Sequence, residues 1–154
     1  MSLPISVMTS ESNNHLGIVS TEKHLISLTK LFISLLNARM YDHAFIRSHM
    51  SPSISVNMNG NIYPGLEAFI HNYKVVADES PEFHTAICNE SALVDEVRGV
   101  GSVLLSQDMS AHGAEGRRMA GTIAYYWRRE AGVWVCESCS MMYGTPEFLA
   151  GDGG

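Results

Sequence analysis

The sequence predicts one α+β domain, in which N-terminal helices pack into the hollow of a curved and mostly antiparallel sheet. Helix-like spacing of apolar residues ends near residue 81, and long strand-like segments with short separators follow it. The length of 154 residues suits a single domain. We expect this domain to span 20–148, with a flexible N-terminus at 1–19 and a flexible C-terminus at 149–154.

The first helix is expected to begin at Ser20 or Thr21, because either hydroxyl can cap it. Its apolar positions recur at three- and four-residue spacing, at Leu25, Leu28, Phe32 and Leu35. A second, short helix is predicted over 41–49, with Tyr41, Phe45 and His49 on one stripe. The Ser51-Pro52 pair stops it, since the residue before a proline disfavours helix.

A hairpin and a third helix follow. Residues 54–58 alternate between apolar and polar side chains, as a strand does, and Asn59-Gly60 is a strong hairpin signal. After Pro64-Gly65 another helical stripe begins and ends near the turn formers at 78–81. That stripe consists of Leu66, Phe69, Ile70, Tyr73 and Val76.

Four long strands are expected in the second half of the chain. They are predicted at 83–94, 97–109, 117–129 and 133–143. The separators Asp95-Glu96 and Ala131-Gly132 are too short for a crossover helix, so the strands that they join must be antiparallel. Helices first and a meander afterwards is an α+β pattern.

Composition narrows the class of partner. Hydrophobic residues make up 45% of the chain and charged residues 17%, which favours a folded globule over disorder. The formal net charge of −6 argues against nucleic-acid binding, and no apolar run approaches the roughly 18 residues of a membrane span. The first fifteen residues lack a signal core, and three cysteines cannot all pair within the chain. We predict a cytoplasmic protein whose partner is a hydrophobic small molecule.

Several short motifs resemble the nuclear transport factor 2-like superfamily over roughly 22–148. Residues 63–70 resemble a helix start of SnoaL-like polyketide cyclases, and 116–118 resemble the Gly-Arg-Arg/Lys that opens their penultimate strand. Residues 126–134 resemble the last hairpin of scytalone dehydratase, and His84 falls where that enzyme has a substrate-facing histidine. The resemblance implies a cone-shaped fold that hosts isomerases, cyclases, dehydratases and non-catalytic modules.

The chain also departs from that pattern. Ketosteroid isomerases have their aspartate base at the end of the first short strand. Residues 57–59 read Asn-Met-Asn there, so that base is absent from this chain. Asn37 stands where the dehydratase has an acidic residue, and Ile123 stands where it has a pocket asparagine. Neither the isomerase mechanism nor the dehydratase mechanism can therefore be transferred to this chain unchanged.

The register implied by the resemblance predicts which side chains face the pocket. With His84 inward, the inward set is Ala86, Cys88, Val103, Leu105, Gln107, Ile123, Tyr125, Trp127, Val135, Glu137, Cys139 and Met141. Trp134 and Met142 fall on the opposite face, which suits a homodimer contact. The predicted wall is mostly apolar with a few polar groups, as in ligand cavities.

Four residues are candidates for catalysis. His84 is the first, because an imidazole can accept or donate a proton at neutral pH. Its acidic partner is sought among Asp108, Glu137 and Glu67. Each has a structural alternative: an inward hydrogen-bonded histidine, a turn-capping aspartate, a solvated strand glutamate and a first-turn helix glutamate.

The substrate-binding candidates are mostly apolar or aromatic side chains expected on the inner surface. They are His49, Tyr63, Leu105, Ile123, Tyr125, Trp127 and Met141. Cys136 and Cys139 lie three apart and would point to opposite faces of a regular strand, so we expect no metal or redox site there. No phosphate-binding glycine loop is recognised, and no cofactor is expected.

The leading functional hypothesis is a cofactor-free isomerase or cyclase that moves protons on a polyketide- or terpenoid-like intermediate of secondary metabolism. The alternatives are a dehydratase on a similar substrate and a non-catalytic binding or dimerisation module. A histidine and a carboxylate in one cavity would favour the enzyme. A cavity lined by Leu, Met and Tyr would favour the module.

Overall fold

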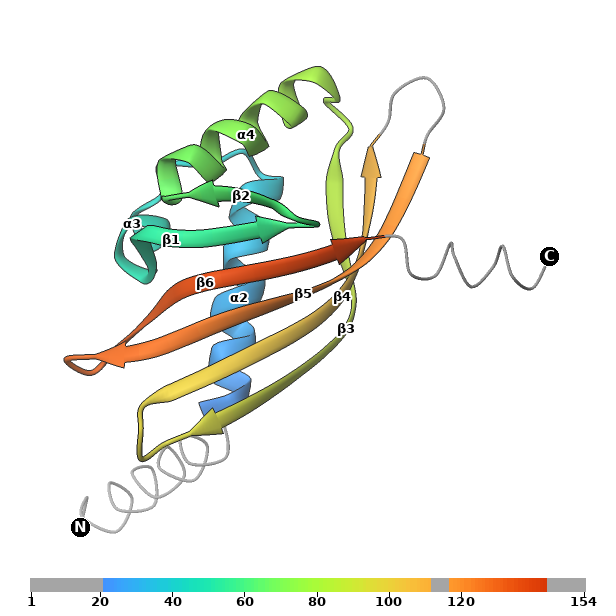
Figure 1. The fold of residues 1–154 in the computed structure, drawn as a ribbon. Coiled ribbons are helices and arrows are strands. Elements are labelled where there is room, and N and C mark those ends of the chain that lie inside the picture. Colours follow the sequence, from blue (N-terminus) through green and yellow to red (C-terminus); the bar gives the residue numbers. More distant parts are fainter. Residues whose placement is uncertain (1–20, 112–116, 144–154) are drawn as a thin grey trace, which may run out of the picture.

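The computed structural model describes residues 21–111 and 117–143. Three helices precede four long strands, and the sheet curves around the longest helix, α2 (Figure 1). This confirms the predicted α+β architecture. The ends at 1–19 and 149–154, and most of the loop expected between 110 and 116, lie outside the described residues.

Helix α2 (Thr21–Asn37) lies across the concave face of the sheet (Figure 1). Its apolar stripe is buried as predicted, with Leu25 and Phe32 almost fully enclosed. Thr29 lies on the same buried face, where its hydroxyl donates to Leu25 O at 2.8 Å and accepts from Trp127 Nε1 at 3.1 Å. The helix is therefore fixed to the sheet by apolar packing and by one buried hydrogen-bond chain.

Helix α3 (Ala44–His49) begins three residues later than the predicted 41–49. His43 causes the delay, because its backbone is extended and its Nδ1 accepts a hydrogen bond from Phe45 N at 3.0 Å. The histidine thus acts as the N-terminal cap. Strand β1 (Met50–Met58) follows directly and pairs with β2 (Asn61–Pro64).

The turn between β1 and β2 confirms the hairpin predicted from Asn59-Gly60. Both residues have positive φ, 57° and 97°, as a type I′ turn requires. Gly65 also has a positive φ of 102°, and helix α4 (Leu66–Glu79) starts after it. This helix lies beyond the β1–β2 hairpin in Figure 1 and closes one end of the concave space.

The four long strands are β3 (His84–Asp95), β4 (Val100–Ala111), β5 (Arg117–Glu130) and β6 (Val133–Tyr143). The sheet order is β2-β1-β6-β5-β4-β3. All neighbours are antiparallel except β1 and β6, which run parallel. The short separators predict the antiparallel pairs correctly, but the predicted strand 97–109 begins three residues too early, because residues 96–99 separate β3 from β4. Strand β1 lies beside β6, on the side opposite β5.

Two bulges change which side chains face the helices. In β3 the register shifts between Ile87 and Asn89, and between β5 and β6 it shifts at Glu137, where Trp127 pairs with Cys136 and Tyr126 with Ser138. A bulge adds one residue to a strand and so reverses the alternation beyond it. The inward set predicted from strict alternation is therefore wrong along part of β6.

Candidate ligand-binding cavity

A cavity of about 190 Å³ lies between α2, α4 and the concave face of the sheet. Its helical wall contains Ile33 and Leu36 from α2 and four side chains from α4, and its sheet wall draws on five strands. The residues that line it are Ile33, Leu36, Val56, Met58, Phe69, Asn72, Tyr73, Val76, Phe83, Thr85, Gln107, Met109, Met119, Ile123, Tyr125 and Met141.

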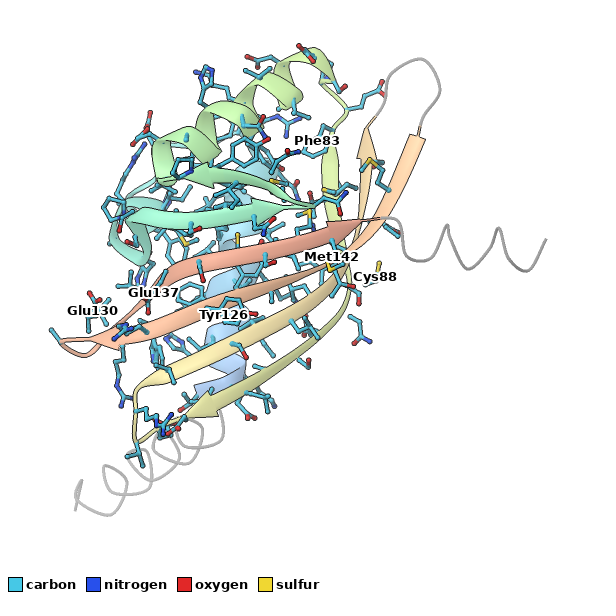
Figure 2. All side chains as sticks on the ribbon, viewed as in Figure 1. Phe83, Cys88, Tyr126, Glu130, Glu137 and Met142 are labelled. Carbon is cyan, nitrogen blue, oxygen red and sulfur yellow. The ribbon has the colours of Figure 1, made fainter. Side chains whose placement is uncertain are left out.

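Aromatic rings brace one end of the cavity. Tyr73 stands against Phe83 with ring centroids 5.3 Å apart and against Phe69 at 6.0 Å. Phe32 of α2 contacts both Phe69 and Tyr125. Figure 2 shows Phe83 at the start of β3, beneath the end of α4. Edge-to-face and tilted contacts of this kind are favourable aromatic arrangements, so the rings at this end of the wall pack against one another.

None of the side chains that line the cavity is charged, and five are polar: Asn72, Tyr73, Thr85, Gln107 and Tyr125. Burial raises the pKa of the Tyr73 phenol to about 12, although nearby Thr85 and Arg39 offset part of the rise. Burial, with the Cys139 thiol adding to it, raises the pKa of Tyr125 well above its usual value. Both phenols are therefore protonated at neutral pH, and the wall is uncharged.

Two polar atoms of the wall make no hydrogen bond of standard geometry with the described residues, although the Thr85 side chain lies close enough to the first of them to lower its pKa. They are Tyr73 Oη and Gln107 Oε1. The side chains that carry them are only 8% and 4% exposed. Buried polar groups are nearly always paired, so both atoms require an explanation.

The predicted inward orientation of His84 is wrong. His84 is exposed, whereas its neighbour Thr85 is buried and lines the cavity. The alternation of β3 therefore starts one residue later than predicted, and Ala86 and Cys88 are exposed with His84. The pocket-facing histidine that the resemblance implied is absent from the described wall.

The acidic candidates also lie away from the cavity wall. Glu137 accepts a 2.6 Å hydrogen bond from Arg128 Nε on the outer face, because the bulge turns it outward (Figure 2). Glu67 is exposed and forms an ion pair with Arg47. Asp108 is half-buried and alternates with the lining residues Gln107 and Met109, which places it on the opposite face. The structure thus brings none of the four catalytic candidates into one cavity.

The substrate-binding candidates divide into two groups. Ile123, Tyr125 and Met141 line the cavity. Leu105 and Trp127 are buried in the core without lining it, and Tyr63 is half-buried on β2. His49 is occupied elsewhere: its Nδ1 lies 2.8 Å from Trp134 O and its ring stacks on Phe45. A role in binding stays a prediction for all seven.

Four polar wall residues were not among the nominated site residues: Asn72, Tyr73, Thr85 and Gln107. Gln107 belongs to the inward set, and a glutamine among Val103, Leu105 and Met109 interrupts an apolar face. Tyr73 sits in the stripe of α4 and is indistinguishable there from an ordinary core aromatic. The glutamine that interrupts the apolar face of β4 was therefore the sequence signal from which a polar wall residue could have been predicted.

Because of the bulge in β6, the predicted orientations of Cys136, relative to Cys139, and of Trp134 are wrong. Cys136 and Cys139 are both buried, on the same face rather than on opposite faces. Burial is the main cause of the raised pKa of both thiols, about 12 for Cys139, so they are packed as neutral side chains. Trp134 is also buried, at 7% exposure, with the Arg129 guanidinium carbon 5.2 Å from its ring. Among the described residues, no three His, Cys, Asp or Glu side chains gather as a metal site.

Comparison with known proteins rests on structure. No protein-family model matches the chain, and no curated protein matches it by sequence. None of the helices described between residues 21 and 143 is long and apolar enough to cross a membrane.

Solved structures resemble the fold closely although their sequences do not. A protein with a cystatin-like fold from Caulobacter vibrioides matches with a TM-score of 0.68 at 13% identity, over 83% of this chain and 92% of that one. The CaMKII hub of S. rosetta matches with a TM-score of 0.66 at 10% identity, over 80% and 96%. A candidate dehydratase of the NTF2-like family from Streptomyces avermitilis matches with a TM-score of 0.65 at 11% identity, over 80% and 95%. At these identities the likeness concerns architecture alone, and the chain has the NTF2-like fold.

Proposed function

We propose that this protein binds a small, neutral and largely apolar molecule in the cavity between α2, α4 and the sheet. The observation that carries the proposal is the wall itself, which is mostly buried, mostly apolar and uncharged. Apolar cavities with a few convergent polar groups are typical of ligand sites. An uncharged wall also disfavours a charged ligand, because a buried ion without a partner is costly.

Binding is placed ahead of catalysis because the wall contains no acid or base that titrates near neutral pH. General acid–base catalysis needs such a group within hydrogen-bond reach of the substrate. His84, Glu137 and Glu67 are exposed or paired outside the cavity, and the lining phenols hold their protons.

The first prediction tests the cavity with isopropylbenzene, an uncharged arene, by isothermal titration calorimetry. We expect saturable one-to-one binding. Ile123→Phe should weaken it at least tenfold, because the larger ring occupies space that the ligand needs. Thr122→Phe is the matched control, since Thr122 is exposed on the opposite face of the same strand.

His84→Ala is a second control and should leave affinity unchanged, since His84 is exposed outside the wall. Absence of arene binding to the wild-type protein, or equal binding to Ile123→Phe, would overturn the assignment of this cavity. Circular dichroism of each variant separates loss of binding from loss of fold.

A cofactor-free isomerase, cyclase or dehydratase acting on a polyketide- or terpenoid-like intermediate is the second candidate. Tyr73 favours it, because a buried phenol that keeps its proton can donate to a substrate carbonyl. The candidate dehydratase of similar fold supports the same class by analogy. Metabolite profiling of a strain lacking the protein, followed by incubation of any accumulated intermediate with pure protein, tests this candidate. Turnover that Tyr73→Phe reduces would establish the enzyme, and binding without turnover would exclude it.

The proposal includes a homodimer formed through the outer face of the sheet. Leu93, Leu104, Tyr126 and Met142 are 46–75% exposed there, and Figure 2 shows Tyr126 and Met142 on the side of the sheet turned away from α2. Leu93, Leu104 and Tyr126 border one shallow groove with serines and alanines, and no charged side chain lines it. The likeness to a protein named as a hub supports association of this fold through some surface.

The second prediction concerns this face. Leu104→Glu should convert the dimer to a monomer in sedimentation equilibrium, because it places a charge at the centre of an apolar contact. Lys74→Glu, an exposed change on α4, is the matched control and should leave the mass unchanged. A wild-type protein that remains monomeric over a roughly hundredfold range of protein concentration would contradict the dimer.

A further inference from the structure

The two unpartnered polar atoms in the cavity wall specify the chemistry of the ligand more closely than its size does. Among buried side-chain nitrogen and oxygen atoms of the described residues, three have no hydrogen-bond partner: Tyr41 Oη, Tyr73 Oη and Gln107 Oε1. Two of these three belong to the cavity wall. The third ring, Tyr41, stands against Tyr73 with centroids 6.3 Å apart.

Apart from Tyr41 Oη, the other buried side-chain nitrogen and oxygen atoms of the described residues have hydrogen-bond partners. Trp127 Nε1 donates to Thr29 Oγ1, which itself donates to the backbone. Asn37 exchanges two 2.9 Å hydrogen bonds with the backbone of Thr85. Two polar atoms of one small cavity that lack such hydrogen bonds are therefore an exception in this interior. They indicate groups that a bound molecule completes.

The two atoms differ in what they require. The amide oxygen of Gln107 accepts hydrogen bonds, so its partner must be a donor. The phenol of Tyr73 keeps its proton, since burial raises its pKa to about 12, and it therefore donates to an acceptor. A hydroxyl group meets both requirements at once, because it donates one hydrogen bond and accepts another.

We propose that the ligand is a neutral, monocyclic alcohol or phenol whose hydroxyl donates to Gln107 Oε1 and accepts from Tyr73 Oη. Its apolar body occupies the space lined by Phe69, Met109, Ile123 and Met141. A cavity of about 150 Å³ holds benzene, so about 190 Å³ suits one ring with a short substituent. This inference rests on the proposed function, because it assumes that the cavity binds a ligand.

The test compares three probes of nearly equal shape by isothermal titration calorimetry. They are 4-isopropylphenol, its methyl ether, and isopropylbenzene. The phenol can donate and accept, the ether can only accept, and the arene can do neither. We expect the phenol to bind about tenfold more tightly than either of the others, as one or two net hydrogen bonds allow.

Two variants assign this preference to the named atoms. Gln107→Leu should remove the advantage of the phenol over its ether. Tyr73→Phe should lower the affinity of the phenol severalfold relative to that of the arene. Both variants should fold, because neither removes a hydrogen bond of standard geometry in the described structure, so each change costs little. Val75→Ala, an exposed position on the same helix, is the matched control.

The outcomes separate this inference from the proposed function. If none of the three probes binds, the binding function itself fails. If the arene and the phenol bind equally, or if Gln107→Leu leaves the preference for the phenol intact, the cavity stands as an apolar site and the hydroxyl-specific inference is overturned.

Discussion

Replacing Trp127 with alanine is expected to lower the free energy of unfolding by about 3–5 kcal/mol, the largest effect of any single change considered for this fold. Trp127 is 1% exposed and lies on the concave face of β5. Its indole nitrogen donates to Thr29 Oγ1 at 3.1 Å, in the middle of α2. The substitution therefore opens a cavity and removes the hydrogen bond that fixes the helix to the sheet. Urea denaturation followed by circular dichroism measures the loss.

The neighbouring residue supplies the control. Arg128→Ala alters an exposed side chain on the other face, where it forms a surface ion pair with Glu137, and should leave the free energy of unfolding close to that of the wild type. Thr29→Val removes the hydroxyl while keeping the shape, and should cost about 1–3 kcal/mol because the indole N–H is left buried without a partner. A loss below about 1 kcal/mol for Trp127→Ala would contradict the buried position of this side chain.

The fold could be predicted from the sequence because its signals are local and repeat over many residues. The stripe of α2, the Asn59-Gly60 turn and the short strand separators each constrain a neighbouring element, and their order excludes most topologies. The start of α3 was predicted three residues early because a histidine cap gives no signal distinct from a helical residue. Element boundaries depend on single side-chain contacts of this kind.

The candidate site was less predictable, because strand faces alternate with a period of two. One error in phase moves every side chain of a strand to the other face. The phase of β3 was taken from the position of His84 in the resemblance, and it was wrong by one residue. The phase of β4 and β5 was right, which placed Gln107, Ile123 and Tyr125 correctly on the inner face.

The bulge at Glu137 could not be read from the sequence. Nothing in Cys136-Glu137-Ser138 distinguishes a regular strand from one with an extra residue. It nevertheless changes the candidate site. It turns Glu137 toward Arg128 on the outer face and so removes the carboxylate that strict alternation would have placed in the cavity. The acid–base hypothesis thereby loses one of the three carboxylates proposed as partners of His84.

Replacing Asn37 with alanine is expected to lower the free energy of unfolding by about 2–4 kcal/mol. Asn37 ends α2, and its side-chain amide forms two 2.9 Å hydrogen bonds with Thr85, one to the backbone oxygen and one from the backbone nitrogen. Since β3 is an edge strand, this amide takes the place of a neighbouring strand at Thr85. Its loss leaves two part-buried backbone groups unpaired.

The same change should weaken ligand binding severalfold, because Phe83 and Thr85 line the cavity at the start of the strand that Asn37 holds. Asn37→Asp is the sharper variant. It keeps an acceptor for the Thr85 N–H but turns a carboxylate oxygen toward the Thr85 carbonyl, so it should be at least as destabilising as alanine. Ser34→Ala, exposed on the same helix, should be neutral or slightly stabilising. Equal unfolding midpoints for Asn37→Ala and the wild type would show that α2 is held to β3 by packing alone.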